Sequence, residues 1–187
     1  MEREMDLRGK EAVSLSSLVK QEYQIPDSYY FGEVKRGLRN SDGTGVLIGV
    51  TKVGSVQGYL IEDGRRIPVP GKLYYRGIDL NEIVEAHRKS GTFGYEEVAY
   101  LLLMGHLPTK SELSYFNDIM CRARKLPEGF TEGMIMRHPS RDIMNDLARS
   151  VLLLYSYDEN PDDISAENLL TQSIKLIGSF PAIVANA

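Results

Sequence analysis

Apolar residues recur at three- and four-residue intervals along most of this chain, which is the spacing of one buried helix face. The first clear helix follows a short β-type segment, Lys72 to Arg76, that lies between two glycines. Asp79 is placed to cap this helix and Gly91 to end it. Its predicted buried face consists of Leu80, Ile83, Val84 and His87.

Two further helices follow directly. Gly94 is the expected cap of the second, which is apolar on most of its surface and should be buried until Gly105 ends it. Thr109 with Glu112 forms a capping-box pattern that opens the third, and Pro127 is expected to stop it.

The same spacing predicts helices further along. Ser140 is the expected cap of a long helix with apolar positions from Ile143 to Tyr155. Another helix runs through Leu169 and Ile177 and is expected to end at Gly178. Pro181 is then expected to begin a new, strongly apolar helix that stops with the chain at Ala187, which favours truncation over an apolar tail lying in a groove.

Residues of β-type are confined to one region. Val46 to Val53 and Ser55 to Ile61 are rich in β-branched residues, with a turn expected at Asp63-Gly64. Together with the segment from Lys72 they predict a small antiparallel sheet near residues 46–76. The predicted fold class is therefore mainly α, a multi-helical domain with this sheet.

The N-terminal part carries weaker patterns. Leu7 to Tyr23 has apolar residues at helical spacing, and Gln24 to Phe31 is expected to be an extended lead-in. We therefore expect residues 1–31 to form a helix and a lead-in, and residues 32–187 to form the main domain.

Composition narrows the class of protein. With 42% hydrophobic and 26% charged residues in 187, the chain falls in the range of a soluble globular domain. A net charge of −4 gives no support to nucleic-acid binding or to an acidic membrane surface as partner. The single cysteine, Cys121, and the lack of a signal-peptide or membrane-span pattern predict a cytoplasmic protein.

The residues that carry chemistry all have structural interpretations. His87 lies late in a helix, His106 follows a helix-ending glycine, and His138 precedes a proline at a helix entrance. Gly43 to Gly45 lacks the lysine of a P-loop, and Cys121 is expected to pack inside a helix. We therefore predict no catalytic and no metal-binding residue here.

Several ordered segments resemble the N-terminal signature of citrate synthases, a family that includes 2-methylcitrate synthases. They are Gly71 to Leu80, Glu96 to Gly105, Leu107 to Thr109, Lys35 to Arg39, His138-Pro139 and Ile177 to Val184. The resemblance extends from about Gly32 to the last residue. It implies the first part of a large helical domain, ending before the motifs that supply the family's catalytic histidines and aspartate.

The resemblance also implies substrates and a partner. The full-length parent would condense acetyl-CoA with oxaloacetate, as a homodimer and without a further cofactor. A carboxylate takes the proton from the methyl group while histidines polarise the reacting carbonyls. Arg36 matches the arginine that several members direct at the adenosine phosphate of coenzyme A, a binding role for which guanidinium is suited.

Two alternatives stay open from the sequence. The chain could be an inactive N-terminal fragment of a citrate synthase, or a noncatalytic helical module that serves interaction or regulation. Within the first alternative, the sequence does not separate citrate synthase from 2-methylcitrate synthase, because the acyl pocket would lie outside these residues.

Overall fold

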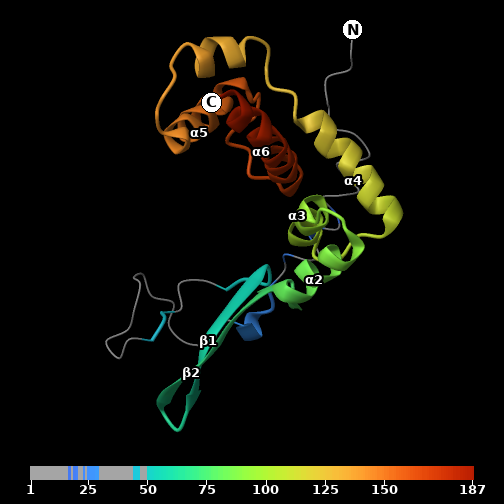
Figure 1. The fold of residues 1–187 in the computed structure, drawn as a ribbon, viewed down its shortest axis with the longest axis vertical. Helices are drawn as coiled ribbons and strands as arrows, with labels where there is room; N and C mark the ends of the chain where they lie inside the picture. The colour runs from blue at the N-terminus through green and yellow to red at the C-terminus, as the bar shows by residue number, and fades with distance from the viewer. Residues whose placement is uncertain (1–16, 18, 21–22, 24, 30–43, 47–49) are drawn as a thin grey trace. The chain divides into compact units, whose positions relative to one another are not determined.

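The computed structural model describes residues 17, 19–20, 23, 25–29, 44–46 and 50–187. Over these residues the fold is mainly helical with one small antiparallel sheet, which confirms the predicted fold class. The chain divides into two compact units. We call them the hairpin unit, residues 21–107, and the helical unit, residues 108–187 together with the first twenty residues. Figure 1 labels the elements along the chain.

The hairpin unit contains a short 3-10 turn, three strands and two helices. Their bounds are η1 Asp27–Tyr29, β1 Gly54–Glu62, β2 Arg65–Tyr75, β3 Ile78–Asp79, α2 Leu80–Ser90 and α3 Tyr95–Met104. The strands are antiparallel in the order β1-β2-β3. The expected extended lead-in is therefore wrong where η1 forms, and most of the helix predicted for Leu7 to Tyr23 lies outside the described residues.

Two tight turns connect the three strands. Asp63 and Gly64 join β1 to β2 with φ of 47° and 72°, and Arg76 and Gly77 join β2 to β3 with φ of 49° and 84°. Positive φ at both central residues gives a turn the twist that antiparallel strands need. The turn predicted at Asp63-Gly64 is confirmed.

The sheet begins later than the sequence predicts. Residues 50–53 lie outside every strand of the described chain, and residues 47–49 are not described, so the first predicted strand is wrong where it can be seen. Instead, the Val53 carbonyl accepts a hydrogen bond of 2.9 Å from the Arg76 amide. The backbone before β1 is thus used to hold the second turn.

The caps predicted for α2 and α3 are confirmed. The Asp79 carboxylate accepts a hydrogen bond of 2.9 Å from the Asn81 amide at the start of α2. Gly91 and Gly105 end the two helices in the left-handed region, with φ of 65° and 90°. A residue without Cβ adopts that conformation without strain, which is why the sequence shows these ends plainly.

From residue 108 onward, the helical unit contains five helical elements. Their bounds are α4 Lys110–Ala123, the π-helix η2 Thr131–Met136, α5 Ile143–Leu154, the 3-10 turn η3 Tyr155–Tyr157 and α6 Ala166–Asn186. The capping box before α4 is present, with the Thr109 amide donating to Glu112 Oε2 at 2.7 Å. α4 ends at Ala123, before Pro127 is reached. No helix among the described residues is long and apolar enough to cross a membrane.

The cap of α5 differs from the predicted one. Asp142, not Ser140, caps this helix, because its carboxylate accepts hydrogen bonds from the amides of Met144 and Asn145 at 3.0 and 3.3 Å. The Ser140 hydroxyl accepts from the Asp142 amide at 3.1 Å, so it supports the cap from two residues earlier. Both side chains suit a helix start, and the choice of Ser140 from the sequence is wrong.

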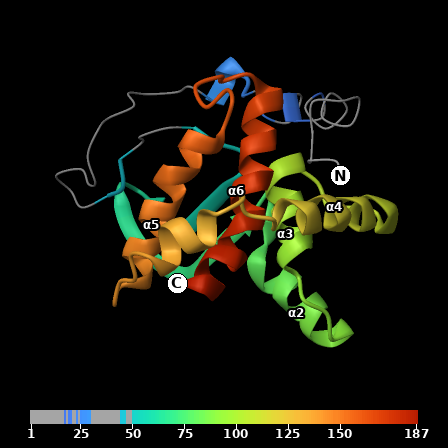
Figure 2. The ribbon, with the colours of Figure 1, turned by 90° about the horizontal axis from the view of Figure 1, so that it is seen from above.

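The predicted break at Gly178 and the predicted helix start at Pro181 are both wrong. α6 runs through both positions without interruption. Gly178 lies where α6 packs on α4 (Figure 2), and a Cβ built on it would stand 2.5 Å from the Cβ of Ala123. The glycine therefore serves helix contact instead of helix termination. Pro181 lacks the amide that would bond to the Ile177 carbonyl, yet buried Ile183 beyond it keeps the last turns packed.

The core of the helical unit lies between these helices. Phe130, Ile135 and Ile183 form one buried cluster, and Phe116 and Ile119 of α4 are also buried. The aromatic ring of Phe130 meets that of Tyr157 edge to face, with 5.8 Å between the ring centroids. Apolar contact between α4, α6 and the short helices therefore holds this unit together.

Replacing Gly178 with alanine should destabilise the helical unit by about 1–3 kcal/mol, since the added methyl group overlaps Ala123 and its backbone. Urea denaturation gives the change in unfolding free energy. Gly133→Ala is the matched control, because a Cβ there meets nothing within 4 Å. Adding Ala123→Gly should recover part of the loss, and a Gly178→Ala variant as stable as Gly133→Ala would contradict the contact.

Candidate functional site

The candidate coenzyme A residue, Arg36, lies outside the described residues, so its predicted role stays a prediction. The three histidines are all described. His87 and His106 belong to the hairpin unit and His138 to the helical unit. Each has its own local neighbours, which decide what its ring can do.

His87 is packed into the corner between α2 and α3. Its Nδ1 lies 2.8 Å from Thr92 Oγ1, and a Cβ on Gly94 would stand 2.5 Å from the imidazole. Its buried Nε2 lies 3.3 Å from Glu97 Oε1 and has no hydrogen-bond partner among the described residues. The sequence does not show this carboxylate partner, because Glu97 is on the next helix. The ring therefore lies between two helices, in space that the missing Cβ of Gly94 leaves open.

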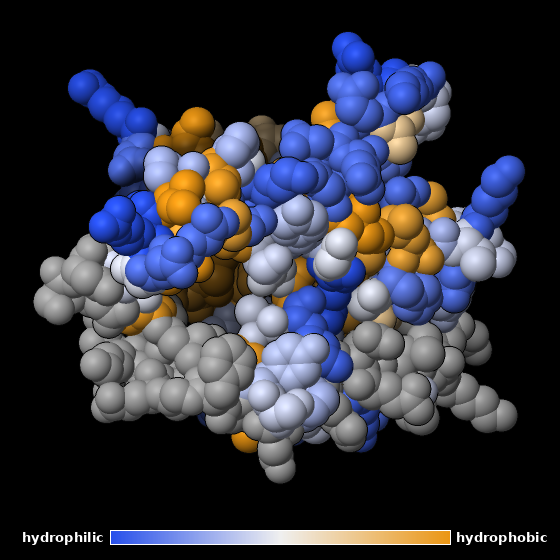
Figure 3. Space-filling view, turned by 90° about the horizontal axis from the view of Figure 1, so that it is seen from below, coloured by the Kyte–Doolittle hydropathy of each residue, from blue (hydrophilic) through white to orange (hydrophobic). Residues whose placement is uncertain are grey.

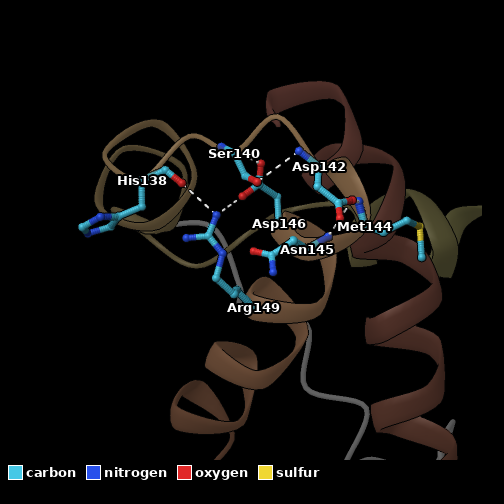
Figure 4. A network of polar contacts seen from close by, with 7 residues as sticks. All are labelled: His138, Ser140, Asp142, Met144, Asn145, Asp146 and Arg149. Atoms are coloured by element: carbon cyan, nitrogen blue, oxygen red, sulfur yellow. Dashed lines mark hydrogen bonds and ion pairs between the residues drawn. The ribbon is translucent and has the colours of Figure 1, made fainter.

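The other two histidines are exposed. The His106 ring contacts the Tyr100 ring edge to face, with centroids 5.5 Å apart. His138 contributes its backbone carbonyl to the structure, accepting from Arg149 Nη2 at 2.8 Å, while its ring points away from the contact (Figure 4).

The best-organised polar cluster is the Asp146–Arg149 pair on α5. Asp146 is only 3% exposed and accepts hydrogen bonds from Arg149 Nη2 and, at 3.2 Å, from the Ser140 amide. Figure 4 shows both side chains gathered under the turn formed by residues 138–142. The pair therefore binds the backbone of the turn that leads into α5. The sequence contains this signal as opposite charges three residues apart on a helix.

A second cluster closes the end of α3. The Leu102 carbonyl lies in the last turn of α3, where helix carbonyls run out of regular amide partners. It accepts from Arg76 Nη2 at 2.8 Å and Nε at 3.3 Å, and from the Tyr23 hydroxyl at 3.2 Å. The Arg76 guanidinium also lies over the Tyr23 ring, 4.7 Å from its centroid. An arginine at a helix C-terminus meets the negative end of the dipole, so this cluster is structural.

The acidic loop before α6 is held by its own hydrogen bonds. Tyr155 Oη lies 3.0 and 3.1 Å from the Asp162 carboxylate oxygens, and the hydrogen bond to Asp162 raises the pKa of Tyr155. Gln172 donates to Asp158 at 3.3 Å. No group of three metal-ligating side chains occurs in the part of the chain that the structure describes.

Taken together, the polar side chains hold turns and helix ends. Figure 3 shows apolar side chains reaching the surface in more than one place among hydrophilic ones. Over the described residues, the fold and these contacts define a class: a mainly helical protein with a small antiparallel sheet.

Comparison with known proteins identifies the family. The family model for the citrate synthase C-terminal domain matches residues 42–187. The chain is 28% identical to the citrate synthase of Haloferax volcanii over 158 residues, which is 82% of this chain and 36% of that protein. It is 32% identical to the citrate synthase of Corynebacterium glutamicum over 118 residues, 63% of this chain and 26% of that protein.

A solved structure and a relative with a different printed activity also match this chain. The citrate synthase structure from Pyrobaculum aerophilum superposes with a TM-score of 0.59 at 28% identity, covering 83% of this chain and 39% of that one. The 2-methylcitrate synthase of Shewanella oneidensis is 30% identical over 112 residues, 60% of this chain and 28% of that protein. The chain belongs to the citrate synthase family, and it spans between a quarter and two fifths of the length of these four proteins.

Replacing Arg149 with alanine should destabilise the helical unit by about 3 kcal/mol, because it leaves the buried Asp146 carboxylate without its cation. We expect the low end of the usual range, since the Arg149 side chain is 34% exposed. Urea midpoints at constant m-value measure the loss.

Arg88→Ala is the matched control for that experiment. Arg88 pairs with Glu85 at the same three-residue spacing, but both side chains are largely in solvent, so the loss should stay below about 1 kcal/mol. Equal losses of unfolding free energy in the two variants would show that burial of Asp146 does not determine the contribution of the Asp146–Arg149 pair.

Proposed function

We propose that this chain is part of an enzyme that condenses acetyl-CoA with oxaloacetate to give citrate and free coenzyme A. The observation that carries the proposal is the family match over residues 42–187. Relatives named citrate synthase at 28% and 32% identity support it. The single cysteine of the sequence is consistent with a reducing cytoplasm as the place of action.

The chemistry of such a condensation needs groups of three kinds. A carboxylate must remove a proton from the thioester methyl group, donors must stabilise the enolate, and cations must bind the carboxylates of oxaloacetate. Within this chain, Arg36 is our candidate for the coenzyme A phosphate. We propose that the carboxylate, the donors to the enolate and the cations for oxaloacetate come from sequence outside these 187 residues.

We therefore propose that the 187-residue chain by itself is inactive. The contacts of two of its histidines support this: His87 is enclosed between two helices, and the described contact of His138 is made by its backbone carbonyl and not by its ring. The role left to this segment is to form a helical scaffold onto which catalytic groups can be mounted.

The purified chain, mixed with acetyl-CoA and oxaloacetate, should release no coenzyme A thiol above the buffer rate. Loss of a whole catalytic set lowers turnover by about six orders of magnitude, so a partial rate is not expected. Cys121 is exposed, so the prediction that it packs inside a helix is wrong. The assay therefore needs a Cys121→Ser background, because the free thiol reacts with the detecting reagent.

Two controls make the assay decisive. The citrate synthase of Haloferax volcanii serves as the positive control, and the longest polypeptide that contains these 187 residues tests the condensation itself. Thiol release by the 187-residue chain that is lost on changing His87, His106 or His138 to alanine would place the active site in this segment and overturn the inactivity. A longest polypeptide without activity would overturn the condensation.

A second candidate reaction is the formation of 2-methylcitrate. The 30% identity to the Shewanella oneidensis enzyme favours keeping it, since this value lies between those of the two citrate synthases. The same assay separates the two when propionyl-CoA replaces acetyl-CoA. A kcat/KM at least tenfold higher for propionyl-CoA would favour the second candidate.

We also propose that copies of the chain associate through the helical unit. Large apolar side chains are exposed there, including Met144 at 69% and Leu152 at 75%. Light scattering should give a mass above that of the 21.0 kDa chain at micromolar concentration. Leu152→Glu should lower that mass more than the control Lys175→Glu on the exposed surface of α6, and a clean monomer would contradict the proposal.

A further inference from the structure

A chain of hydroxyl groups directs the protons at the corner between α2 and α3. Ser90 Oγ lies 3.0 Å from the Ala86 carbonyl oxygen and 3.2 Å from the His87 carbonyl oxygen. Carbonyl oxygens only accept hydrogen bonds, so the single hydroxyl proton of Ser90 points to them. Ser90 Oγ also lies 2.7 Å from Thr92 Oγ1, and that hydrogen bond then requires Thr92 to donate its own proton.

The Thr92 hydroxyl in turn determines which nitrogen of the His87 ring carries hydrogen. His87 Nδ1 lies 2.8 Å from Thr92 Oγ1. Because the Thr92 proton is directed at Ser90, the Thr92 oxygen accepts this bond and Nδ1 must carry a hydrogen. A neutral imidazole has a hydrogen on one nitrogen and a lone pair on the other. A neutral His87 ring would therefore have a bare lone pair on Nε2.

Nε2 faces the carboxylate of Glu97 on α3. It lies 3.3 Å from Glu97 Oε1, it is buried, and it has no hydrogen-bond partner in the part of the chain that the structure describes. A bare lone pair beside a carboxylate oxygen is repelled, whereas a charged ring attracts the carboxylate at this distance at any N–H angle. The two side chains are only 17% and 28% exposed, so water screens that attraction in part.

The position of His87 in its helix also favours a charged ring. It lies in the last turn of α2, where the helix dipole is negative and attracts cations. Glu96 precedes Glu97 in the first turn of α3 and adds negative charge to that side. The other charged residues in this part of α2 are exposed: Glu85, Arg88 and Lys89.

We propose that His87 is held as the imidazolium in the folded chain, and that its charge pair with Glu97 is a proton-dependent link between α2 and α3. A histidine in an unfolded chain gives up its proton near about pH 6.5, so above that pH the folded chain holds a proton that the unfolded chain lacks. Stability then falls as the pH rises, until the ring itself loses the proton and the link opens. Alkaline pH therefore loosens this corner of the hairpin unit.

The protonation state of the ring is measured directly by ¹H–¹⁵N correlation spectra of the histidine rings in the 187-residue chain. At pH 7.5 an ordinary histidine is about one tenth protonated. We expect at least half of the His87 rings to carry hydrogen on both nitrogens at that pH, and about one tenth in the Glu97→Gln variant. A His87→Asn spectrum assigns the signal.

Urea unfolding at two pH values measures the link between the helices. Glu97→Gln should raise the unfolding equilibrium constant by a factor about tenfold larger at pH 5.5 than at pH 8.5, the low end for a hydrogen bond to a charged group. The loss of a helix-dipole contribution from Glu97 is the same at both pH values and cancels in this comparison. Glu85→Gln is the control, because its exposed partner Arg88 stays charged throughout and its effect should not change with pH.

Ser90→Ala tests the hydroxyl chain. Without Ser90 Oγ, Thr92 can donate to Nδ1, so at pH 8.5 the neutral His87 ring should carry its hydrogen on Nε2. The wild-type ring should carry it on Nδ1 at the same pH.

Four results would each overturn the proposal. They are a wild-type His87 ring that is no more protonated than an ordinary histidine at pH 7.5, a wild-type ring with its hydrogen on Nε2 at pH 8.5, a Ser90→Ala ring unchanged from the wild type, and a Glu97→Gln loss that is equal at the two pH values. The ring spectra of the wild type need no substitution, so they decide the charge of His87 even where a variant fails to fold.

Discussion

The close approach of α4 and α6 is the constraint on which the helical unit depends. Gly178 and Ala123 bring the two helix backbones together because neither position carries more than a methyl group. At that separation, the buried side chains of α4 and α6, such as Phe116 and Ile174, fill the space beside the crossing. Cores are packed to the density of organic crystals, so one added methyl group at the crossing would displace side chains along both helices.

The hairpin unit depends on a different requirement, the satisfaction of backbone groups at the end of α3. The Leu102 carbonyl needs donors, and Arg76 supplies two of the three that reach it. The same arginine occupies a left-handed turn position that favours glycine, at φ 49°. Its side-chain contacts thus compensate for the backbone strain, and the turn and the helix end stabilise each other.

Local signals in the sequence predicted local structure well. Asp79, Gly91, Gly105 and the Thr109 capping box were assigned correctly because each acts within a few residues of itself. Gly178 was not, since a glycine in an apolar helix looks like a helix end until its partner on α4 is known. Periodicity does not show which distant helix a residue will meet.

The contacts of the candidate site were less accessible to sequence reasoning. His87 is enclosed between two helices, and its partner Glu97 lies on the other helix, so the two could be paired only in three dimensions. Asp142 and Ser140 are both good caps, and their order was settled by which carboxylate or hydroxyl reaches the free amides. Arg36 stays a prediction, because it lies outside the described residues.

The pairing of α4 with α6 also bears on how the chain is made. The hairpin unit ends at Leu107, so its described strands and helices can close as soon as they leave the ribosome. α4 is synthesised next, but the partner that covers Phe116 and Met120 is the last helix of the described chain. These apolar side chains stay without that cover while residues 124–165 are translated. Chaperones that bind apolar side chains would therefore meet α4 during this interval and not in the finished fold.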